Sequence, residues 1–366
     1  MRILHIITRI NQGGTARWLD VLVEQQRKAG HEVLIVSGEV QGAEEEDELV
    51  RTLPVLKLPV LGRALSPWND ARALERLTLF LRRLRPDVVN THTSKAGALG
   101  RVANVTLGPR RPTLVHTIHG HLLSGFAGPR GTAVIRETER ALGRASDALI
   151  CVGPIAYEGI VQAGIGKGRP VVDILPGARA LILPGRAEAR RAHGLADDDF
   201  VVAWVGRMTR QKNPDRALDT ARRLPHTTWL MAGDGDLLPE VLDSAPDNVR
   251  ILGWTDPGPV LAAADVYVHT ADWEGFPYSV IEALQAGLRV VATDAVPPVP
   301  GVTRIDPALP DLAGRLADAV SAVLMAGPEP EDARWDRADI FRAETFGDAH
   351  EAVYDAARRR RRGLPR

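Results

Sequence analysis

The chain has 366 residues, of which 45% are hydrophobic and 25% charged, and its formal net charge at pH 7 is zero. This length allows two domains that each bury a core of their own, and the neutral charge disfavours nucleic acid as a partner. No stretch approaches the ~18–20 apolar residues of a membrane span, and residues 1–10 are too short and too interrupted by charge for a signal peptide. The one cysteine, Cys151, cannot form an internal disulfide, so we expect a cytoplasmic protein.

The first half of the sequence alternates between strand-like and helix-like segments, which is typical of an α/β fold with a parallel sheet. Strands are predicted near residues 3–8, 32–37, 87–91, 113–119 and 147–152, and helices near residues 16–29, 67–84, 96–107, 131–143 and 155–163. Residues 1–175 should therefore form one doubly wound, Rossmann-like domain.

Glycines and polar residues follow the predicted strands of this first domain. Gly13 and Gly14 lie after the first strand, where paired glycines either let the backbone approach a ligand or make a tight turn. His119 ends the fourth strand. A histidine there is usually a hydrogen-bonded structural group, but doubly wound sheets bind ligands at the carboxyl ends of their strands. We therefore predict that His119 lines a ligand site.

A second series of strands is predicted near residues 200–205, 228–232, 249–252, 266–269 and 289–292. The stretch 175–185, which contains proline and glycine, is the natural hinge between the two series. Residues 186–340 should form a second Rossmann-like domain, and residues 341–366 a terminal helix that returns to the first domain and ends in a basic tail. Two such domains, face to face, would enclose one cleft lined by the ends of their strands.

Arg207 and Lys212 follow the first strand of the second domain, within one turn. Such a pair is more often a solvated surface feature, but it can also clamp a diphosphate, because a guanidinium group binds two oxygens at once. Gly233 ends the next strand, and Asp234 and Asp236 after it could be misread as a metal-binding pair. No cluster of histidine, cysteine and aspartate has the spacing of a metal site, so we expect no metal ion.

Residues 270–287 are the most informative segment of the chain. After the strand near residues 266–269, the chain turns at Pro277 and opens a helix at about Ser279. The backbone amides at such a helix start bind phosphate groups. Glu274 and Glu282 flank this position. Because carboxylates repel phosphate, we predict that they hold sugar hydroxyls beside it.

Ser279 and Glu282 are also spaced as a capping box, in which the serine caps the helix and the glutamate bonds back to the cap. On that pattern alone, a structural role for Glu282 outweighs a functional one. The full spacing of Glu274, Phe276, Pro277 and Glu282 favours function. It resembles the Glu-x7-Glu signature of retaining, nucleotide-sugar-dependent glycosyltransferases of the GT-B fold, in the large family-four group.

Other motifs extend this resemblance over nearly the whole chain. Residues 205–213, around Arg207 and Lys212, match the family's pattern, and residues 90–97 and 115–126 look closest to members that build capsular or exopolysaccharide repeat units. The resemblance implies two Rossmann-like domains, with the acceptor bound by the first and the nucleotide sugar by the second. It implies a hexosyltransferase that moves a sugar from a nucleotide diphosphate, with a UDP-sugar favoured, to a hydroxyl acceptor with retention. It implies neither a metal ion nor another cofactor.

The resemblance also assigns roles to individual residues. The implied catalytic residues are His119, Glu274, Arg207 and Lys212. The residues implied in donor binding are Gly13, Gly14, Arg207, Lys212, Gly233, Phe276, Pro277, Tyr278, Ser279 and Glu282. An apolar loop that contains Leu122, Leu123 and Phe126 would either pack in the core or contact a lipid-linked acceptor.

Two departures from the family leave other functions open. The family has a glycine-rich turn after the strand near residues 289–292, whereas this chain has the proline-rich stretch 293–301, and residues 175–179 lack the usual Asn-Gly. A proline loop offers fewer amide donors. This loop favours one alternative, a non-catalytic partner subunit of another transferase. The other alternative is a nucleotide-sugar 2-epimerase, which shares the fold and needs no acceptor.

Basic residues suggest a membrane surface as a further partner. Arginines are spaced along the amphipathic helix near residues 67–84 and form a run at 358–362. Basic runs are usually just solvated, but each charge near an anionic bilayer adds ~1 kcal/mol of attraction. We expect peripheral contact with the inner membrane face.

Overall fold

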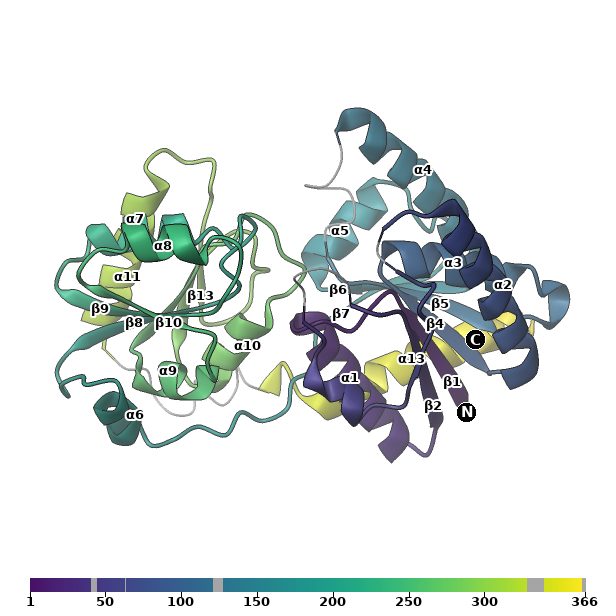
Figure 1. Ribbon diagram of the computed structural model, residues 1–366, viewed down its shortest axis with the longest axis horizontal. Coiled ribbons are helices and arrows are strands. Elements are labelled where there is room, and N and C mark those ends of the chain that lie inside the picture. The colour runs from purple at the N-terminus through teal and green to yellow at the C-terminus, as the bar shows by residue number, and fades with distance from the viewer. Residues whose placement is uncertain (41–44, 63, 121–127, 328–338, 364–366) are drawn as a thin grey trace. The chain divides into compact units, whose positions relative to one another are not determined.

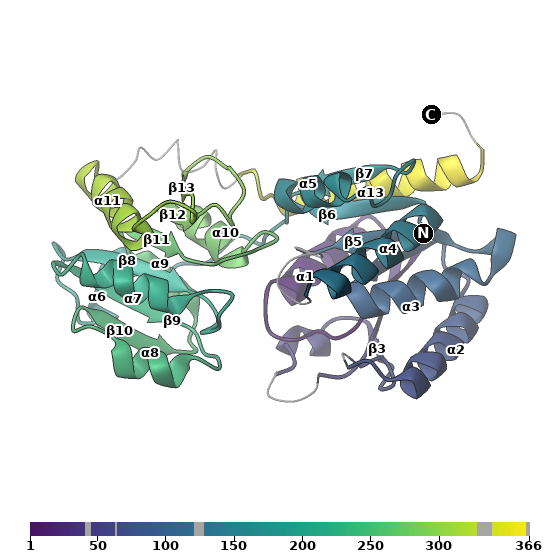
Figure 2. The same cartoon turned by 90° about the horizontal axis from the view of Figure 1, so that it is seen from above.

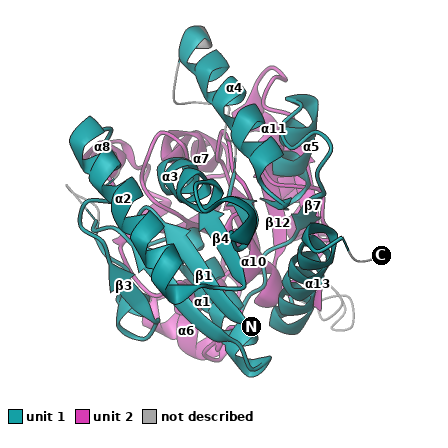
Figure 3. Cartoon of the chain, turned by 90° about the vertical axis from the view of Figure 1, so that its right-hand side faces the viewer, with its two compact units in different colours: residues 1–178, 342–366 teal, residues 179–341 magenta. Residues whose placement is uncertain are grey.

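The computed structural model describes residues 1–40, 45–62, 64–120, 128–327 and 339–363 (Figure 1). The chain divides into two compact units, which Figure 3 colours separately. Unit 1 consists of residues 1–178 and 342–366, and unit 2 consists of residues 179–341. Leu122, Leu123 and Phe126 of the predicted apolar loop lie outside the described residues. In the described ranges, none of the helices is both long enough and apolar enough to cross a bilayer.

Unit 1 is built on a seven-stranded parallel sheet in the order β3-β2-β1-β4-β5-β6-β7. Figure 2 labels β3, β5, β6 and β7 of this sheet. Its strands are β1 (Arg2–Ile7), β2 (Glu32–Ser37), β3 (Val55–Lys57), β4 (Val88–His92), β5 (Thr113–Ile118), β6 (Ala148–Val152) and β7 (Val171–Ile174). Its helices are α1 (Gly14–Lys28), α2 (Pro67–Leu84), α3 (Ser94–Val105), α4 (Pro129–Ala145), α5 (Pro154–Gln162) and α13 (Ala343–Arg361). Strands β1 to β3 are added toward one edge of the sheet and strands β4 to β7 toward the other, so the switch point lies between β1 and β4. Open sheets of this kind bind ligands beyond the strand ends at the switch point.

Alternate side chains along the strands of unit 1 face two different environments. On one face, Leu4 and Ile6 of β1 pack in an apolar cluster with Leu77 of α2. On the other face, His5 of β1 bonds to Gln26 of α1, and α1 contacts α13 along the same side. One face of the sheet is therefore an ordinary apolar core, and the other carries buried polar groups.

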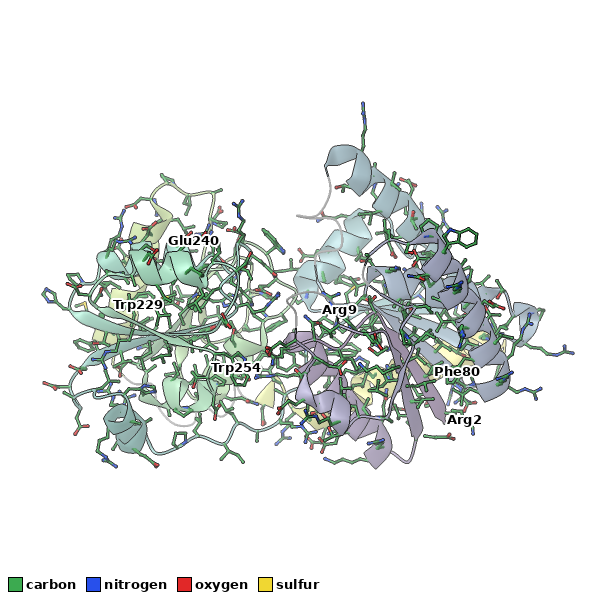
Figure 4. All side chains as sticks on the ribbon, viewed as in Figure 1. Arg2, Arg9, Phe80, Trp229, Glu240 and Trp254 are labelled. Atoms are coloured by element: carbon green, nitrogen blue, oxygen red, sulfur yellow. The ribbon has the colours of Figure 1, made fainter. Side chains whose placement is uncertain are left out.

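Unit 2 is built on a six-stranded parallel sheet in the order β10-β9-β8-β11-β12-β13. Its strands are β8 (Phe200–Val205), β9 (Thr227–Ala232), β10 (Val249–Gly253), β11 (Val266–His269), β12 (Arg289–Thr293) and β13 (Val302–Ile305). Its helices are α6 (Arg186–Ala192), α7 (Pro214–Arg222), α8 (Leu238–Ser244), α9 (Pro257–Ala263), α10 (Tyr278–Gln285) and α11 (Leu312–Met325). Trp229, labelled in Figure 4, is fully buried in the core of this unit together with Trp204. The switch point of this sheet lies between β8 and β11.

The two parallel sheets with alternating helices confirm the predicted α/β, doubly wound architecture. The strands predicted at residues 32–37 and 200–205 have those bounds in the structure. Three strands were not predicted, namely β3, β7 and β13, each of which lies at an edge of its sheet. They are three or four residues long and mostly half-exposed. They therefore lack the continuous apolar run by which a buried parallel strand is found in a sequence.

Candidate functional site

Two loops of unit 2 lie together at the switch point of its sheet. Residues 206–213 follow β8, and residues 270–277 follow β11, which pairs with β8. The hydroxyl of Thr270 accepts a hydrogen bond from Trp204 Nε1 at 2.9 Å and donates to the carbonyl of Lys212 at 2.9 Å. A buried threonine thus ties the two loops to each other and to the core.

Lys212 and Glu274, one from each loop, form a buried ion pair. Lys212 Nζ lies 2.5 Å from Glu274 Oε1, and His269 Nε2 lies 3.6 Å from the same oxygen. Glu274 is only 8% exposed. Burial alone would raise the pKa of its carboxyl group, but the charge of Lys212 and the contact with His269 outweigh burial and lower the pKa to about 2. Two of the predicted catalytic residues are thus brought together, with the carboxylate ionised at neutral pH.

Arg207 lies in the same loop as Lys212 and is exposed. The neighbouring backbone is held in place, because the amide of Met208, which is fully buried, donates to the carbonyl of Asp234 at 2.8 Å. The loop after β8 therefore presents Arg207 to solvent, while Lys212 is held by a carboxylate.

Gly233 has a packing reason to be glycine. Its φ angle is 147°, a value that side chains disfavour, and a Cβ atom there would lie 1.7 Å from the carbonyl oxygen of Gly206. The loop after β9 thus packs directly on the loop after β8. The predicted contact of Gly233 with the nucleotide sugar stays a prediction, because this packing explains the glycine without a ligand.

The helix α10 begins one residue earlier than predicted. Pro277 is its N-cap residue, with φ −75°, and Tyr278 is its first residue. Ser279 therefore lies inside the first turn and cannot cap the helix, so the capping-box interpretation of Ser279 and Glu282 is wrong. The backbone of Pro277 is extended, with ψ 126°, and helical geometry begins at the residue after it.

The first turn of α10 lies against the predicted site. Its leading amides carry the positive end of the helix dipole. Glu282 is 8% exposed and Phe276 is 6% exposed. The ring of Phe276 packs edge-on against Phe341 at a centroid distance of 5.2 Å. The helix start thus places Glu282, like Glu274, in a largely buried position.

In unit 1, the paired glycines follow β1, which lies at the switch point of the sheet. Gly13 is the N-cap residue of α1, with φ 143°, and Gly14 is its first residue. Both are exposed, and a Cβ atom on Gly13 would meet nothing within 4 Å. The backbone conformation rather than crowding therefore requires glycine at Gly13.

His119 follows β5 and is partly exposed. Its Nε2 lies 3.0 Å from His92 Nδ1, and its ring packs edge-on against Trp18 at a centroid distance of 4.7 Å. Burial of the ring, together with His350 and His5, lowers the pKa of His119 to about 3. His119 is therefore a neutral, hydrogen-bonded group at the end of a strand.

Sequence reasoning missed the residues that support His119. His5, His92 and Asn90 are fully buried in β1 and β4. All three point to the face of the sheet that α1 and α13 cover, where Tyr354 bonds to Asn90 at 2.8 Å. The available signal was the two-residue spacing of Asn90 and His92 in one strand, which places them on a single face.

The proline-rich stretch after β12 packs inward. Val296 is fully buried, and Thr293 Oγ1 donates to the carbonyl of Ala271 at 2.5 Å. This stretch is thus tied to the loop after β11. Within the described residues, no group of three or more histidine, cysteine, aspartate or glutamate side chains is arranged to hold a metal ion.

Comparison with known families matches each half of the chain to a glycosyltransferase model. Residues 12–172 match the model described as Glycosyltransferase Family 4. Residues 199–325 match the model described as Glycosyl transferases group 1. The two matches fall in units 1 and 2, respectively.

Curated relatives include bacterial glycosyltransferases. A UDP-Gal:alpha-D-GlcNAc-diphosphoundecaprenol alpha-1,3-galactosyltransferase of Escherichia coli is 28% identical over 270 residues, which are 68% of this chain and 67% of the relative. The capsular polysaccharide biosynthesis glycosyltransferase CapM of Staphylococcus aureus is 23% identical over 74% of each chain. A GDP-mannose-dependent alpha-mannosyltransferase of Mycobacterium tuberculosis is 27% identical over 82% of this chain and 81% of its own.

Solved structures share the fold over nearly the full length. A sucrose-phosphate synthase from Thermosynechococcus elongatus aligns with 97% of this chain and 99% of its own, at a TM-score of 0.79 and 18% identity. HepE of Anabaena in complex with UDP aligns with 97% of this chain and 100% of its own, at a TM-score of 0.76 and 20% identity. The chain therefore carries the two domains of a GT-B glycosyltransferase, a Glycosyltransferase Family 4 domain followed by a glycosyl transferases group 1 domain.

Proposed function

We propose that the protein transfers a hexose from a nucleotide diphosphate to a hydroxyl acceptor, with retention of the anomeric configuration. The observation that carries this proposal is the buried Lys212–Glu274 pair beside the start of α10, at the switch point of unit 2. A cation, a carboxylate and the positive end of a helix dipole together match the needs of a sugar diphosphate, which has both charged phosphates and neutral hydroxyls.

The chemical step needs stabilisation of a leaving diphosphate. The bond between the anomeric carbon and the phosphate oxygen breaks while the acceptor oxygen bonds to the same face of that carbon. The departing phosphate takes the acceptor proton, so no separate protein base is required. Arg207, Lys212 and the amides of Tyr278 and Ser279 stabilise the charge that develops on the diphosphate.

The ion pair gives Lys212 and Glu274 a shared role in donor binding. A phosphate that reaches Lys212 competes with Glu274 for the ammonium group. The freed carboxylate, still ionised because its pKa is about 2, then accepts hydrogen bonds from sugar hydroxyls. Glu282 holds the ribose, and Gly233, Phe276 and Pro277 shape the donor site around it.

Unit 1 contributes the acceptor side in this proposal. Gly13 and Gly14, exposed at the start of α1, let the backbone approach the donor phosphates and the acceptor. His119 positions the transferred sugar. Replacing His119 by alanine should leave nucleotide affinity nearly intact and lower transfer by ~10²-fold, because a group that orients the reacting centre is lost.

The relatives support a UDP-sugar donor and a lipid-linked acceptor. The E. coli relative is named for UDP-galactose and a diphosphoundecaprenol acceptor, and the structure of HepE contains UDP. The mycobacterial relative is named for GDP-mannose, so both nucleotides belong in a test. The role given to Arg207 and Lys212 makes the reaction independent of a divalent metal.

We further propose that α2 brings unit 1 to an anionic membrane surface on the cytoplasmic side. Leu65 is 88% exposed and Trp68 is 81% exposed at the start of this helix, and Arg72 and Arg76 are exposed along it. An apolar tip with arginines behind it fits a bilayer interface. Trp68→Ser should reduce cosedimentation with phosphatidylglycerol vesicles, whereas Trp254→Ser, which removes the exposed tryptophan of unit 2 labelled in Figure 4, should not.

A thermal-shift screen tests the enzymatic proposal. UDP-galactose, UDP-glucose and GDP-mannose are added in turn, since only ligands of the folded state raise the melting temperature. We expect one nucleotide sugar to raise it, and Glu282→Gln to abolish that shift with little change in the melting temperature of the free protein. A variant that melts much earlier yet binds the nucleotide normally would contradict the role of Glu282.

Product analysis separates the two alternatives. A 2-epimerase would convert the sugar nucleotide to its epimer without an acceptor. A non-catalytic partner subunit would bind the nucleotide sugar but release no nucleotide with any acceptor. Under the proposed function, nucleotide release depends on the acceptor and falls substantially in Lys212→Ala, because its charge matters most when the leaving group is most negative.

A further inference from the structure

Four side chains inside unit 1 form one continuous hydrogen-bonded line that ends at His119. Gln26 Oε1 lies 2.9 Å from His5 Nε2, and His5 Nδ1 lies 2.9 Å from His92 Nε2. His92 Nδ1 lies 3.0 Å from His119 Nε2. Gln26, His5 and His92 are at most 1% exposed, whereas His119 is partly exposed. Among the described residues, nothing bonds to Nδ1 of His119.

The line has a direction, because a neutral imidazole has one donor nitrogen and one acceptor nitrogen. The carbonyl oxygen of Gln26 can only accept, so His5 donates from Nε2 and accepts at Nδ1. His92 must then donate from Nε2 and accept at Nδ1. By the same step, His119 donates from Nε2 and keeps a lone pair on Nδ1.

The orientation of Gln26 is supported from its other side. Gln26 Nε2 lies 3.4 Å from the hydroxyl of Tyr354 on α13. Asn90 Nδ2 donates to the same hydroxyl at 2.8 Å, and Thr117 Oγ1 donates to Asn90 Oδ1 at 3.0 Å. With its amide nitrogen toward Tyr354, Gln26 turns its carbonyl oxygen toward His5.

Burial keeps the rings of the line neutral. It lowers the pKa of His5 to about 4 and, with neighbouring histidines, that of His119 to about 3. The pKa of His92 also lies well below its ordinary value, through burial and the adjacent rings. Trp18 covers the line edge-on, 5.3 Å from the ring of His92 and 4.7 Å from that of His119. A proton added to any ring would make both its nitrogens donors and reverse part of the line.

We propose that Gln26 is a positioning residue that acts through His5 and His92 and holds His119 in the tautomer whose Nδ1 accepts a hydrogen bond from a substrate hydroxyl. This inference rests on the proposed function, which puts a sugar beside His119. A fixed lone pair at that point favours a hydroxyl group, which can donate. It disfavours a carboxylate or a phosphate, whose oxygens can only accept. The line therefore sets which chemical group His119 recognises.

Nitrogen-15 NMR of the histidine rings of the full-length protein at pH 7 tests the tautomer directly, because protonated and unprotonated ring nitrogens resonate far apart. We expect His119 to be protonated at Nε2 and bare at Nδ1 in the unaltered protein. Protonation of His119 at Nδ1 would overturn the proposal. This measurement needs neither a variant nor a sugar donor.

Two substitutions test whether Gln26 sets that tautomer. Gln26→Glu keeps an oxygen that accepts from His5, so His119 should stay protonated at Nε2. Gln26→Leu removes the acceptor and lets the whole line reverse, so Nδ1 of His119 should become protonated in a substantial fraction of molecules. An unchanged tautomer in Gln26→Leu would overturn the proposal. The melting temperature of both variants shows whether the fold persists.

A kinetic readout then separates this inference from the proposed function. Release of UDP from UDP-galactose or UDP-glucose, or of GDP from GDP-mannose, should slow about tenfold in Gln26→Leu, the effect of one lost hydrogen bond. In Gln26→Glu the rate should stay within about twofold. Nucleotide affinity should be equal in all three proteins. Equal rates in Gln26→Leu and the unaltered protein would overturn the substrate contact. If the unaltered protein turns over none of these donors, the proposed function fails, while the tautomer measurements still decide the role of Gln26.

Discussion

Replacing Lys212 by methionine should destabilise unit 2 by about 3 kcal/mol at pH 7, and the loss should shrink in acid. Methionine keeps the unbranched shape of the side chain but leaves the carboxylate of Glu274, which is 8% exposed, without its cation. The pKa of Glu274 falls from an ordinary 4.5 to about 2 in the folded protein. At about 1.4 kcal/mol for each pKa unit, this fall corresponds to about 3 kcal/mol of folding stability.

Because folding lowers the pKa of Glu274, the stabilisation by the ion pair decreases as the pH falls. A carboxyl whose folded pKa lies below its unfolded value contributes its full stability above the unfolded pKa. The contribution is lost as the pH falls through the folded pKa, because the carboxyl is then protonated in both states. The effect of Lys212→Met should therefore fall to less than half, about 1.4 kcal/mol, by pH 3.

Urea unfolding of the full-length protein at several pH values measures this effect. Pulsed hydrogen exchange of peptides from β8 and β11 assigns the transition to unit 2, since a two-unit protein does not unfold in one step. In the background of Glu274→Gln, the substitution should have little effect at any pH. Asp219→Asn, which removes an exposed ion pair with Arg222 in the same unit, should change stability by less than about 1 kcal/mol. An equal loss at pH 7 and pH 3 would refute the reasoning.

Three further outcomes are expected. Transfer activity should survive EDTA, and a full loss restored by magnesium or manganese would show that a metal is needed. Arg101→Met should destabilise unit 1 by about 3–5 kcal/mol in urea unfolding, because it leaves Glu139 buried without the guanidinium that now binds both its oxygens at 2.7 Å. Gly233→Ala should lower the melting temperature of unit 2, since a Cβ atom would lie 1.7 Å from the carbonyl oxygen of Gly206; an unchanged melting temperature would show that the two loops separate easily.

The sequence predicted where the two site loops of unit 2 lie along the chain, but it did not predict the contact between them. Strand and turn patterns placed Lys212 and Glu274 after separate strands, but the ion pair between them depends on β8 and β11 being neighbours. A single sequence shows which segments are strands, whereas their order in the sheet depends on how the helices between them pack. The predicted alternation was therefore sufficient for the fold class and insufficient for the pairing of these two side chains.

Two local errors have clear physical causes. Ser279 and Glu282 have the spacing of a capping box. The N-cap residue is Pro277, however, so the helix begins at Tyr278 and Ser279 lies in its first turn. In unit 1, His119 was singled out because it ends a strand, while His5 and His92 were given no individual role. Their common face becomes evident only when β1 and β4 are known to be adjacent.

The position of α13 has a consequence for how the protein is made. This helix follows unit 2 in the chain, yet Tyr354 and His350 lie buried in unit 1 against α1 and the sheet. As the chain leaves the ribosome, the hydrogen bonds of Asn90 and Gln26 to the hydroxyl of Tyr354 therefore cannot form until all of unit 2 has emerged. The segment synthesised first is thus completed last, and the line of rings that ends at His119 acquires its final anchor only when translation has passed residue 354.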